Sequence, residues 1–274
     1  MNKFVLSFGL GLCCSAAASA QGWPGSVNLT FAGMLSGGSA NIAFITGPGG
    51  AALAYNSTAA WNGNSVSNNV GARNLTYGSH TFVTYAAQTA ATAFPASPNT
   101  FAVDTVALTD VPDGGAAQSP MGANKATIVQ DLYARYYTDS LTSTVKSRAF
   151  QIALFEVIGE RWDAPGTGLT TAAQIVAEIR SLGESNVLTI GQFRAGTSQA
   201  IVLDQLAVRA QAVTYLSGMG GVSGTDFWSS AINGFRTVGP TNYADQLLLV
   251  PIGAPGIIAG LGLVGVVALR RRRK

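Results

Sequence analysis

The sequence predicts an α+β fold: an N-terminal antiparallel β-sandwich or barrel, a helical lobe, a closing C-terminal strand and a single C-terminal membrane helix. Three observations lead to this expectation. Apolar residues alternate with polar ones in residues 21–118, as in strands with one buried face. They recur at helical spacing in residues 121–217. A wholly apolar stretch then precedes a basic C-terminus, the pattern of a membrane segment with its charges on the cytoplasmic side.

The N-terminus has the pattern of a secretory signal peptide over residues 1–20. Lys3 gives a short positive start, an apolar run covers residues 4–12, and Ala-Ser-Ala ends at Ala20. Signal peptidase recognises such small residues, so we expect it to be a partner and to cut between Ala20 and Gln21. Both cysteines precede this cut. The mature chain is therefore expected to contain neither a disulfide nor a thiolate.

The C-terminal segment, residues 251–274, has the composition of a membrane anchor. The apolar residues 257–269 end in a cationic cluster. A helix from Pro255 to Leu269 would be about 22 Å long and one from Pro251 about 28 Å, against roughly 30 Å for the hydrocarbon core of a bilayer. We expect at least transient membrane anchoring of an exported chain. The cations of the cluster are Arg270, Arg271, Arg272, Arg273 and Lys274.

The net charge reflects these terminal segments. The chain has 16 basic and 13 acidic residues, a net charge of +3. Six of the basic residues lie in the terminal segments and all 13 acidic residues lie in residues 21–250, so this region carries a charge of −3. Its basic residues are scattered singly, and we expect no nucleic acid partner.

Residues 21–250 are expected to form one exported domain with three regions. Residues 21–118 hold four charged residues and many turn-forming glycine, proline and asparagine clusters, which favours short antiparallel strands. Helical periodicity covers residues 121–217, and residues 225–250 form the closing strand region. Helices are expected over residues 123–137, 141–158, 170–182 and 198–216, and strands over residues 187–190 and 242–250, while residues 227–238 are ambiguous.

A glutamine stands in the middle of the most apolar helix. A buried, unpaired Gln151 would cost on the order of 1–3 kcal/mol. The stretch Ala-Phe-Gln-Ile-Ala-Leu-Phe-Glu, which ends at Glu156, resembles the "A-x-Q-x-A-I-W-E" helix of bacterial thioester-type surface domains and of related domains in PEP-CTERM exported proteins. Leu132 and Tyr133 are similar to the "L-Y" of the family's preceding helix. Residues 244–251 look like the "Q-D-Q-L…V-P" stretch before the sorting signal.

The resemblance implies a fold and a reactive bond, but the sequence departs from the family at one position. In adhesive members, a cysteine on an earlier strand forms an internal thioester with the helix glutamine and captures a surface nucleophile. The best match to the cysteine pattern is residues 82–88, with Ala86 at the cysteine position. A second register, residues 101–104, also has alanine there. Gln151 therefore cannot form a thioester, and we expect it to bridge the helix to a neighbouring strand by bonds to the main chain.

The tail resembles a PEP-CTERM-type sorting signal, which an exosortase-type enzyme cuts and discards. Residues 250–256 lack the Pro-Glu-Pro that names this signal. Variant recognition by a sorting enzyme and simple membrane retention are both compatible with the sequence, as are a cell-envelope location and later release.

Other chemical signals are weak, and we expect no catalytic residue, metal site or cofactor. His80 is the only histidine and stands in a turn-like setting. Glu156 and Glu160 lie one helical turn apart, and paired carboxylates can hydrolyse glycosides. We expect Glu156 to be hydrogen-bonded within the helical lobe, and Glu160 with Arg161 to form a solvated helix end.

Two functional hypotheses follow. The first is a non-catalytic exported cell-surface or extracellular-matrix protein with an adhesion-like domain that lacks the reactive bond. The alternative is an extracellular polysaccharide hydrolase using Glu156 or Glu160. A groove with converging carboxylates would favour the hydrolase, whereas a packed Glu156 would favour the surface protein. Trp61, Trp162 and Trp228 could contact a polysaccharide in either case, although tryptophan is more often buried.

Overall fold

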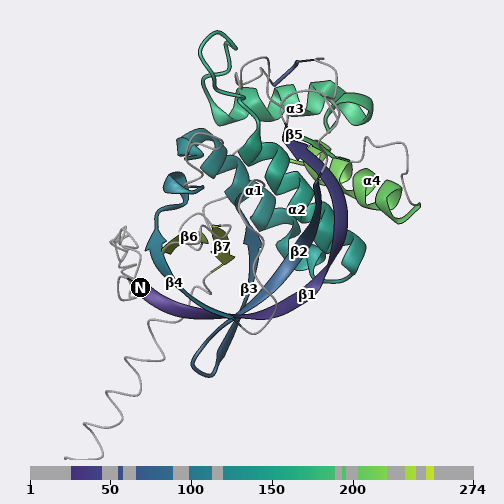
Figure 1. Cartoon of the computed structure of the whole chain (residues 1–274). Helices are drawn as coiled ribbons and strands as arrows, with labels where there is room; N and C mark the ends of the chain where they lie inside the picture. The colour runs from purple at the N-terminus through teal and green to yellow at the C-terminus, as the bar shows by residue number, and fades with distance from the viewer. Residues whose placement is uncertain are drawn as a thin grey trace, which may run out of the picture.

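A curled antiparallel sheet and four helices make up the described part of the chain, so the fold is α+β as expected (Figure 1). The computed structural model describes residues 26–44, 55–57, 66–88, 99–112, 120–188, 193–195, 203–220, 232–238 and 245–249. Within these residues, no helix has the length and apolar character needed to cross a bilayer. The predicted signal peptide and the predicted membrane segment lie outside them.

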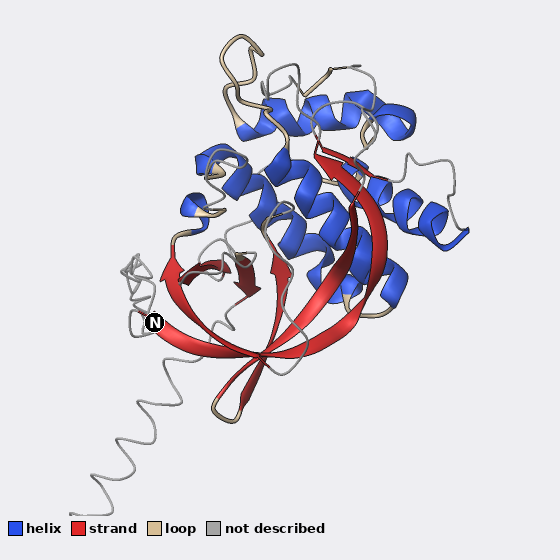
Figure 2. Cartoon of the chain, in the orientation of Figure 1, coloured by secondary structure: helices blue, strands red, loops and turns tan. Residues whose placement is uncertain are grey.

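Seven strands form one sheet with the order β2-β3-β7-β6-β4-β1-β5, and every pair is antiparallel. β1 pairs with β2 as well as with β4 and β5, so the sheet curls into a half-barrel instead of forming the two layers of a sandwich (Figure 2). The strands are β1 (Ser26–Phe44), β2 (Val66–Tyr77), β3 (His80–Ala86), β4 (Asn99–Val106), β5 (Phe193–Ala195), β6 (Ile232–Val238) and β7 (Gln246–Leu249).

The length and bending of β1 produce the curl. Its first part pairs with β4, its later part pairs with β2, and Thr30 and Phe31 pair with both strands. The register with β2 shifts between Phe31 and Gly33 and again between Met34 and Ser36. Such irregularities bend a strand and increase its twist. Gly33 has a φ of 117°, which glycine adopts without the strain that a side chain would impose.

The four helices are α1 (Gly122–Ser140), α2 (Thr144–Gly159), α3 (Ala172–Asn186) and α4 (Leu203–Ser217). They overlap the four predicted helices. α2 is buried on all sides from Ser147 to Gly159, as its nearly uniform apolar character predicts. α3 begins with a capping box in which Thr171 and Gln174 bond to each other's main chain, which supplies partners for free N–H groups of the first turn.

The predicted strand over residues 187–190 is wrong where the structure describes it. Val187 and Leu188 are buried in a turn after α3, because the Val187 N–H still bonds to the Gly183 carbonyl oxygen at 3.2 Å. The short strand β5 begins later, at Phe193. The ambiguous residues 227–238 contain β6, and the predicted strand over residues 242–250 contains β7.

The core is divided between two clusters of buried apolar side chains. The larger one lies between the helices and the sheet and includes Tyr85, Phe150 and Trp162. The smaller one joins β1, β2 and β4. Its members are Leu29, Phe31, Leu75, Phe101 and Val103.

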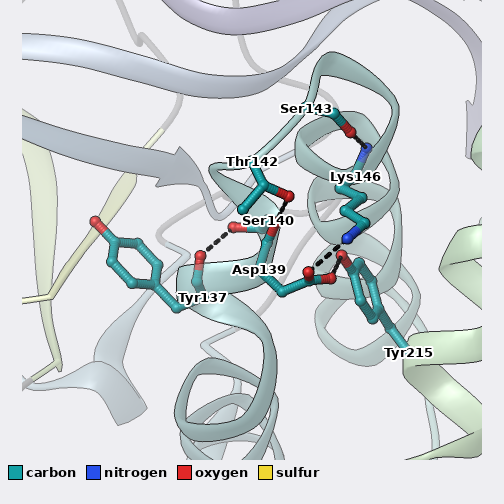
Figure 3. A network of polar contacts seen from close by, with 7 residues as sticks. All are labelled: Tyr137, Asp139, Ser140, Thr142, Ser143, Lys146 and Tyr215. Atoms are coloured by element: carbon teal, nitrogen blue, oxygen red, sulfur yellow. Dashed lines mark hydrogen bonds and ion pairs between the residues drawn. The ribbon is translucent and has the colours of Figure 1, made fainter.

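Asp139 ties three helices together at the turn between α1 and α2 (Figure 3). Its Oδ1 lies 2.6 Å from the Lys146 ammonium on α2, and its Oδ2 accepts a hydrogen bond from the Tyr215 hydroxyl of α4 at 2.8 Å. Ser143 caps α2 by accepting from the Lys146 N–H. The Lys146 bond is the main cause that lowers the pKa of Asp139.

We expect Asp139→Asn to lower the free energy of unfolding by about 1 kcal/mol or less at neutral pH, since the carboxylate is partly exposed and solvent screens the pair. The pKa of Asp139 is lowered in the folded state, so its contribution is present above the ordinary pKa of Asp and is lost as pH falls through the lowered value. Denaturant unfolding should therefore give a lower free energy of unfolding for Asp139→Asn than for the wild type at pH 7, and this difference should disappear in acid. A difference that stays constant with pH would contradict the role of the carboxylate charge.

Candidate functional site

The candidate site lies where β2 and β3 separate. The two strands pair from Tyr77 and His80 as far as Arg73 and Thr84. Beyond this point β2 continues against β1, while β3 continues against β7 until Ala86 pairs with Gln246. Ala86 is therefore a buried strand residue without a partner on β2. Its main-chain N–H and C=O must find hydrogen bonds elsewhere, because buried main-chain groups are almost always paired.

The side chain of Gln151 on α2 provides both bonds. Its Oε1 accepts from the Ala86 N–H at 2.8 Å, and its Nε2 donates to the Ala86 carbonyl oxygen at 2.7 Å. The side-chain amide thus takes the place of a peptide group in a neighbouring strand. Its orientation follows from this pairing, since the flipped amide would place a donor against a donor. The prediction that Gln151 bridges its helix to a strand is confirmed.

Ser147, one helical turn before Gln151, makes the matching bonds on the other side of the gap. Its Oγ accepts from the Ala72 N–H of β2 at 2.8 Å and donates to the Ser36 carbonyl oxygen of β1 at 2.6 Å. α2 is therefore bonded to three strands through two side chains on one face. Figure 1 shows β2 and β3 separating toward the helical layer that contains α2.

Gly71 allows this close approach. It has a φ of 124°, and a Cβ at this position would collide with the Ser36 carbonyl oxygen and lie 3.2 Å from the Ser147 Oγ. A side chain here would both strain the backbone and push the strand away from α2. The glycine at residue 71 is thus part of the same arrangement.

A buried polar group on the sheet lies next to Ala86. Gln246 is paired with Ala86 across β3 and β7, and its Oε1 accepts from the Thr84 hydroxyl at 3.2 Å and from the Arg73 guanidinium at 3.5 Å. Burial lowers the pKa of Arg73 to about 10. The sequence indicated Gln246 only through its resemblance to the stretch before a sorting signal, and its contact with Arg73 was missed.

The glutamates at the end of α2 are both buried, which corrects one prediction. Glu160 was expected at a solvated helix end, but it is 0% exposed, and its Oε1 accepts from the Phe193 N–H of β5. The reason is that the chain turns inward after Glu160: Trp162 is buried and its indole N–H donates to the Glu156 carbonyl oxygen at 3.3 Å. Only Arg161 is exposed as expected.

Glu156 is 1% exposed, and its Oε2 has no hydrogen-bond partner among the described residues, contrary to the hydrogen bond expected within the helical lobe. Burial, with a further contribution from the charge of Glu160, raises the pKa of Glu156 well above its usual range. The nearby Lys125 ammonium instead donates to the Ile158 carbonyl oxygen at 3.0 Å. Burial is the main cause that lowers the pKa of Lys125, and the charges of Asp163 and Glu160 oppose it.

The remaining candidate residues are not brought to this site. His80 is exposed at the β2–β3 hairpin, with its ring 6.4 Å from that of Phe82. Among the described residues, no group of three His, Cys, Asp or Glu side chains could hold a metal ion. Several predicted positions lie outside the described residues, namely Ala20, Gln21, Trp61, Trp228, Pro251, Pro255 and Arg270, Arg271, Arg272 and Arg273.

Comparison with protein-family models, curated proteins and solved structures finds no significant match to this chain. The chemistry of the site must therefore be judged from its own residues. The carboxamide of Gln151 meets a strand position that carries the methyl group of Ala86, and a methyl group cannot act as a nucleophile. The arrangement can join a helix to a sheet, but it cannot form a thioester between these two residues.

We expect Gln151→Met to lower the free energy of unfolding by about 2–5 kcal/mol, because it leaves two buried main-chain groups of Ala86 unpaired while nearly preserving side-chain volume. Denaturant unfolding at neutral pH measures this loss. The matched control is Gln211→Met on the partly exposed surface of α4, where the change should stay within about 0.5 kcal/mol. Equal effects of the two substitutions would contradict the bridging role.

Proposed function

We propose that this chain is a non-catalytic, exported cell-surface or extracellular-matrix protein. Its domain resembles a thioester-type adhesion domain without the reactive bond, and its C-terminal segment acts as a PEP-CTERM-like sorting or anchor signal. The partners are signal peptidase, the membrane, an exosortase-type enzyme where the tail is cut, and a matrix component such as polysaccharide.

One observation supports the proposed resemblance to a thioester-type domain. The motif comparison pairs Gln151 with Ala86, which are 65 residues apart, and their side chain and main chain are joined by two hydrogen bonds of 2.8 and 2.7 Å. These two positions correspond to the glutamine and cysteine that the family joins covalently. A chance match of motifs would not be expected to select two residues in direct contact.

The burial of Glu156 and Glu160 supports the non-catalytic proposal over a polysaccharide hydrolase. A glycosidase needs an acid and a second carboxylate that flank the scissile bond, with room for sugar between them. Both side chains are at most 1% exposed, so a polymer cannot reach them without opening this end of α2. Polysaccharide hydrolysis that is lost in Glu156→Gln, in protein that remains folded, would instead favour the alternative.

If the register of the resemblance is correct, Ala86→Cys should restore a thioester. The new thiolate would attack the carboxamide carbon of Gln151, forming a C–S bond and releasing the amide nitrogen as ammonia. Intact mass spectrometry of the purified variant is then expected to show the loss of one ammonia, and treatment with methylamine is expected to open the thioester with the gain of one methylamine, leaving an N-methyl amide and a free thiol. Ala86→Ser is the control and should keep its full mass. An unreacted thiol in folded Ala86→Cys would contradict the register.

Mass spectrometry of the protein from its native host tests the cellular part of the proposal. The mature chain is expected to begin at Gln21, to occur in the envelope or the medium, and to contain an unmodified Gln151. Processing near residue 250 would indicate sorting, and an intact tail in the membrane fraction would indicate retention. A cytosolic chain that begins at Met1 would overturn export, and a covalent adduct on Gln151 would overturn the absence of a reactive bond.

A further inference from the structure

The two glutamates at the end of α2 have no part in the proposed surface role, and their arrangement is unusual. Fully buried glutamates are rare unless they are paired with a cation. Glu156 and Glu160 lie one helical turn apart and are 1% and 0% exposed. If both were ionised, each would lose its hydration and also repel the other at short range. A proton on one of the two carboxyls removes this repulsion.

The contacts of the two carboxyls decide which one is protonated. Glu160 Oε1 accepts the main-chain N–H of Phe193, and a bond donated to a carboxyl oxygen favours the ionised form. The Oε2 atoms of both glutamates are buried without a hydrogen-bond partner in the described part of the chain, but Glu160 accepts the Phe193 N–H at its other oxygen, whereas no such bond to the Glu156 carboxyl is seen among the described residues. The proton therefore resides on Glu156.

The charged groups on neighbouring elements do not compensate Glu156. Lys125 of α1 donates to the Ile158 carbonyl oxygen, while Arg161 and Asp163, which follow α2, are exposed. Arg209 of α4 is partly exposed. Among the described residues, none of these groups forms an ion pair with Glu156.

We propose that Glu156 and Glu160 form a base-sensitive latch between α2 and β5, in which Glu156 stays protonated while Glu160 holds the Phe193 N–H. When the proton of Glu156 is lost to hydroxide, the new charge repels Glu160 and the bond to Phe193 opens. Phe193 also pairs with Phe44 at the end of β1 and packs its ring 5.9 Å from that of Phe155 on α2. Opening the latch therefore releases β5 and the end of β1 from the helical layer.

The direction of the pH effect follows from the protonation of the two states. Burial raises the pKa of Glu156 in the closed state above its ordinary value of 4.5, whereas the opened carboxyl is hydrated and titrates near that value. Between the two values the closed state binds one more proton than the open state. The equilibrium constant for opening therefore rises about tenfold per pH unit across this window.

Amide hydrogen exchange of Phe193, corrected for the intrinsic pH dependence of exchange, tests the latch in the full domain. The wild-type protection factor is expected to fall with rising pH at up to about tenfold per unit. In Glu156→Gln the protection should not depend on pH, because no proton can be lost. Asp163→Asn is the control and should keep the wild-type slope. A slope that is unchanged in Glu156→Gln, or absent in the wild type, would overturn the proposal.

Infrared spectroscopy of the wild-type protein gives a second test that does not depend on folding of a variant. A buried protonated carboxyl should give its C=O band in D2O at neutral pH, and this band should disappear at the upper end of the pH range over which Phe193 loses protection, where the closed state itself loses the proton. The absence of a protonated-carboxyl band at neutral pH would also overturn the proposal.

Discussion

The two hydrogen bonds between the Gln151 amide and the main chain of Ala86 are the interaction on which the rest of the structure depends. A sheet that curls as strongly as this one must separate β2 from β3, because β2 follows the bent strand β1. The separation leaves the buried residue Ala86 without a partner on β2. Each main-chain group left unpaired would cost about 1–3 kcal/mol. The Gln151 amide prevents this cost by bonding to both the N–H and the C=O of Ala86.

The same requirement explains the residues around it. Ser147 bonds to Ala72 and Ser36 on the other side of the gap, and its spacing of four residues from Gln151 places both side chains on one face of α2. Gly71 lets the strand approach closely enough for the serine to reach it. The other residues of α2, such as Phe150 and Leu154, are apolar and buried, so that the helix can lie between the sheet and the other helices.

The sequence predicted the elements with strong periodicity and failed where tertiary contacts decide. The four helices were predicted because their apolar spacing is regular, and a bond from Gln151 to the main chain of a neighbouring strand was predicted, although not that Ala86 is the residue it meets. Ser147 was missed, since a serine in a helix has no distinctive pattern. Glu160 was misplaced because Glu-Arg usually marks a solvated end, whereas here Trp162 turns the chain back into the core. The three residues of β5 carry too little pattern to predict their pairing with β1.

The proposed role follows from the absence of a thiol at residue 86 as well as from the hydrogen bonds that Gln151 makes there. Residue 86 is an alanine, and the Gln151 amide takes the place of a neighbouring peptide group there and holds the sheet to the helical layer. Under the proposed role, the domain presents a surface and does not capture a nucleophile through this pair of residues. On this proposal, the helix segment around Gln151 serves to bond α2 to the sheet.

Amide hydrogen exchange at two neighbouring residues of one folded variant tests this role most directly. The Ala86 N–H donates to Gln151, whereas the Ala87 N–H donates to the Asp245 carbonyl oxygen at 2.7 Å. In Gln151→Met, under conditions where the protein stays folded, protection of Ala86 should fall sharply while that of Ala87 is largely kept. Unchanged protection of Ala86, or an equal loss at both residues, would contradict the assignment of Gln151 as the partner that β2 does not supply.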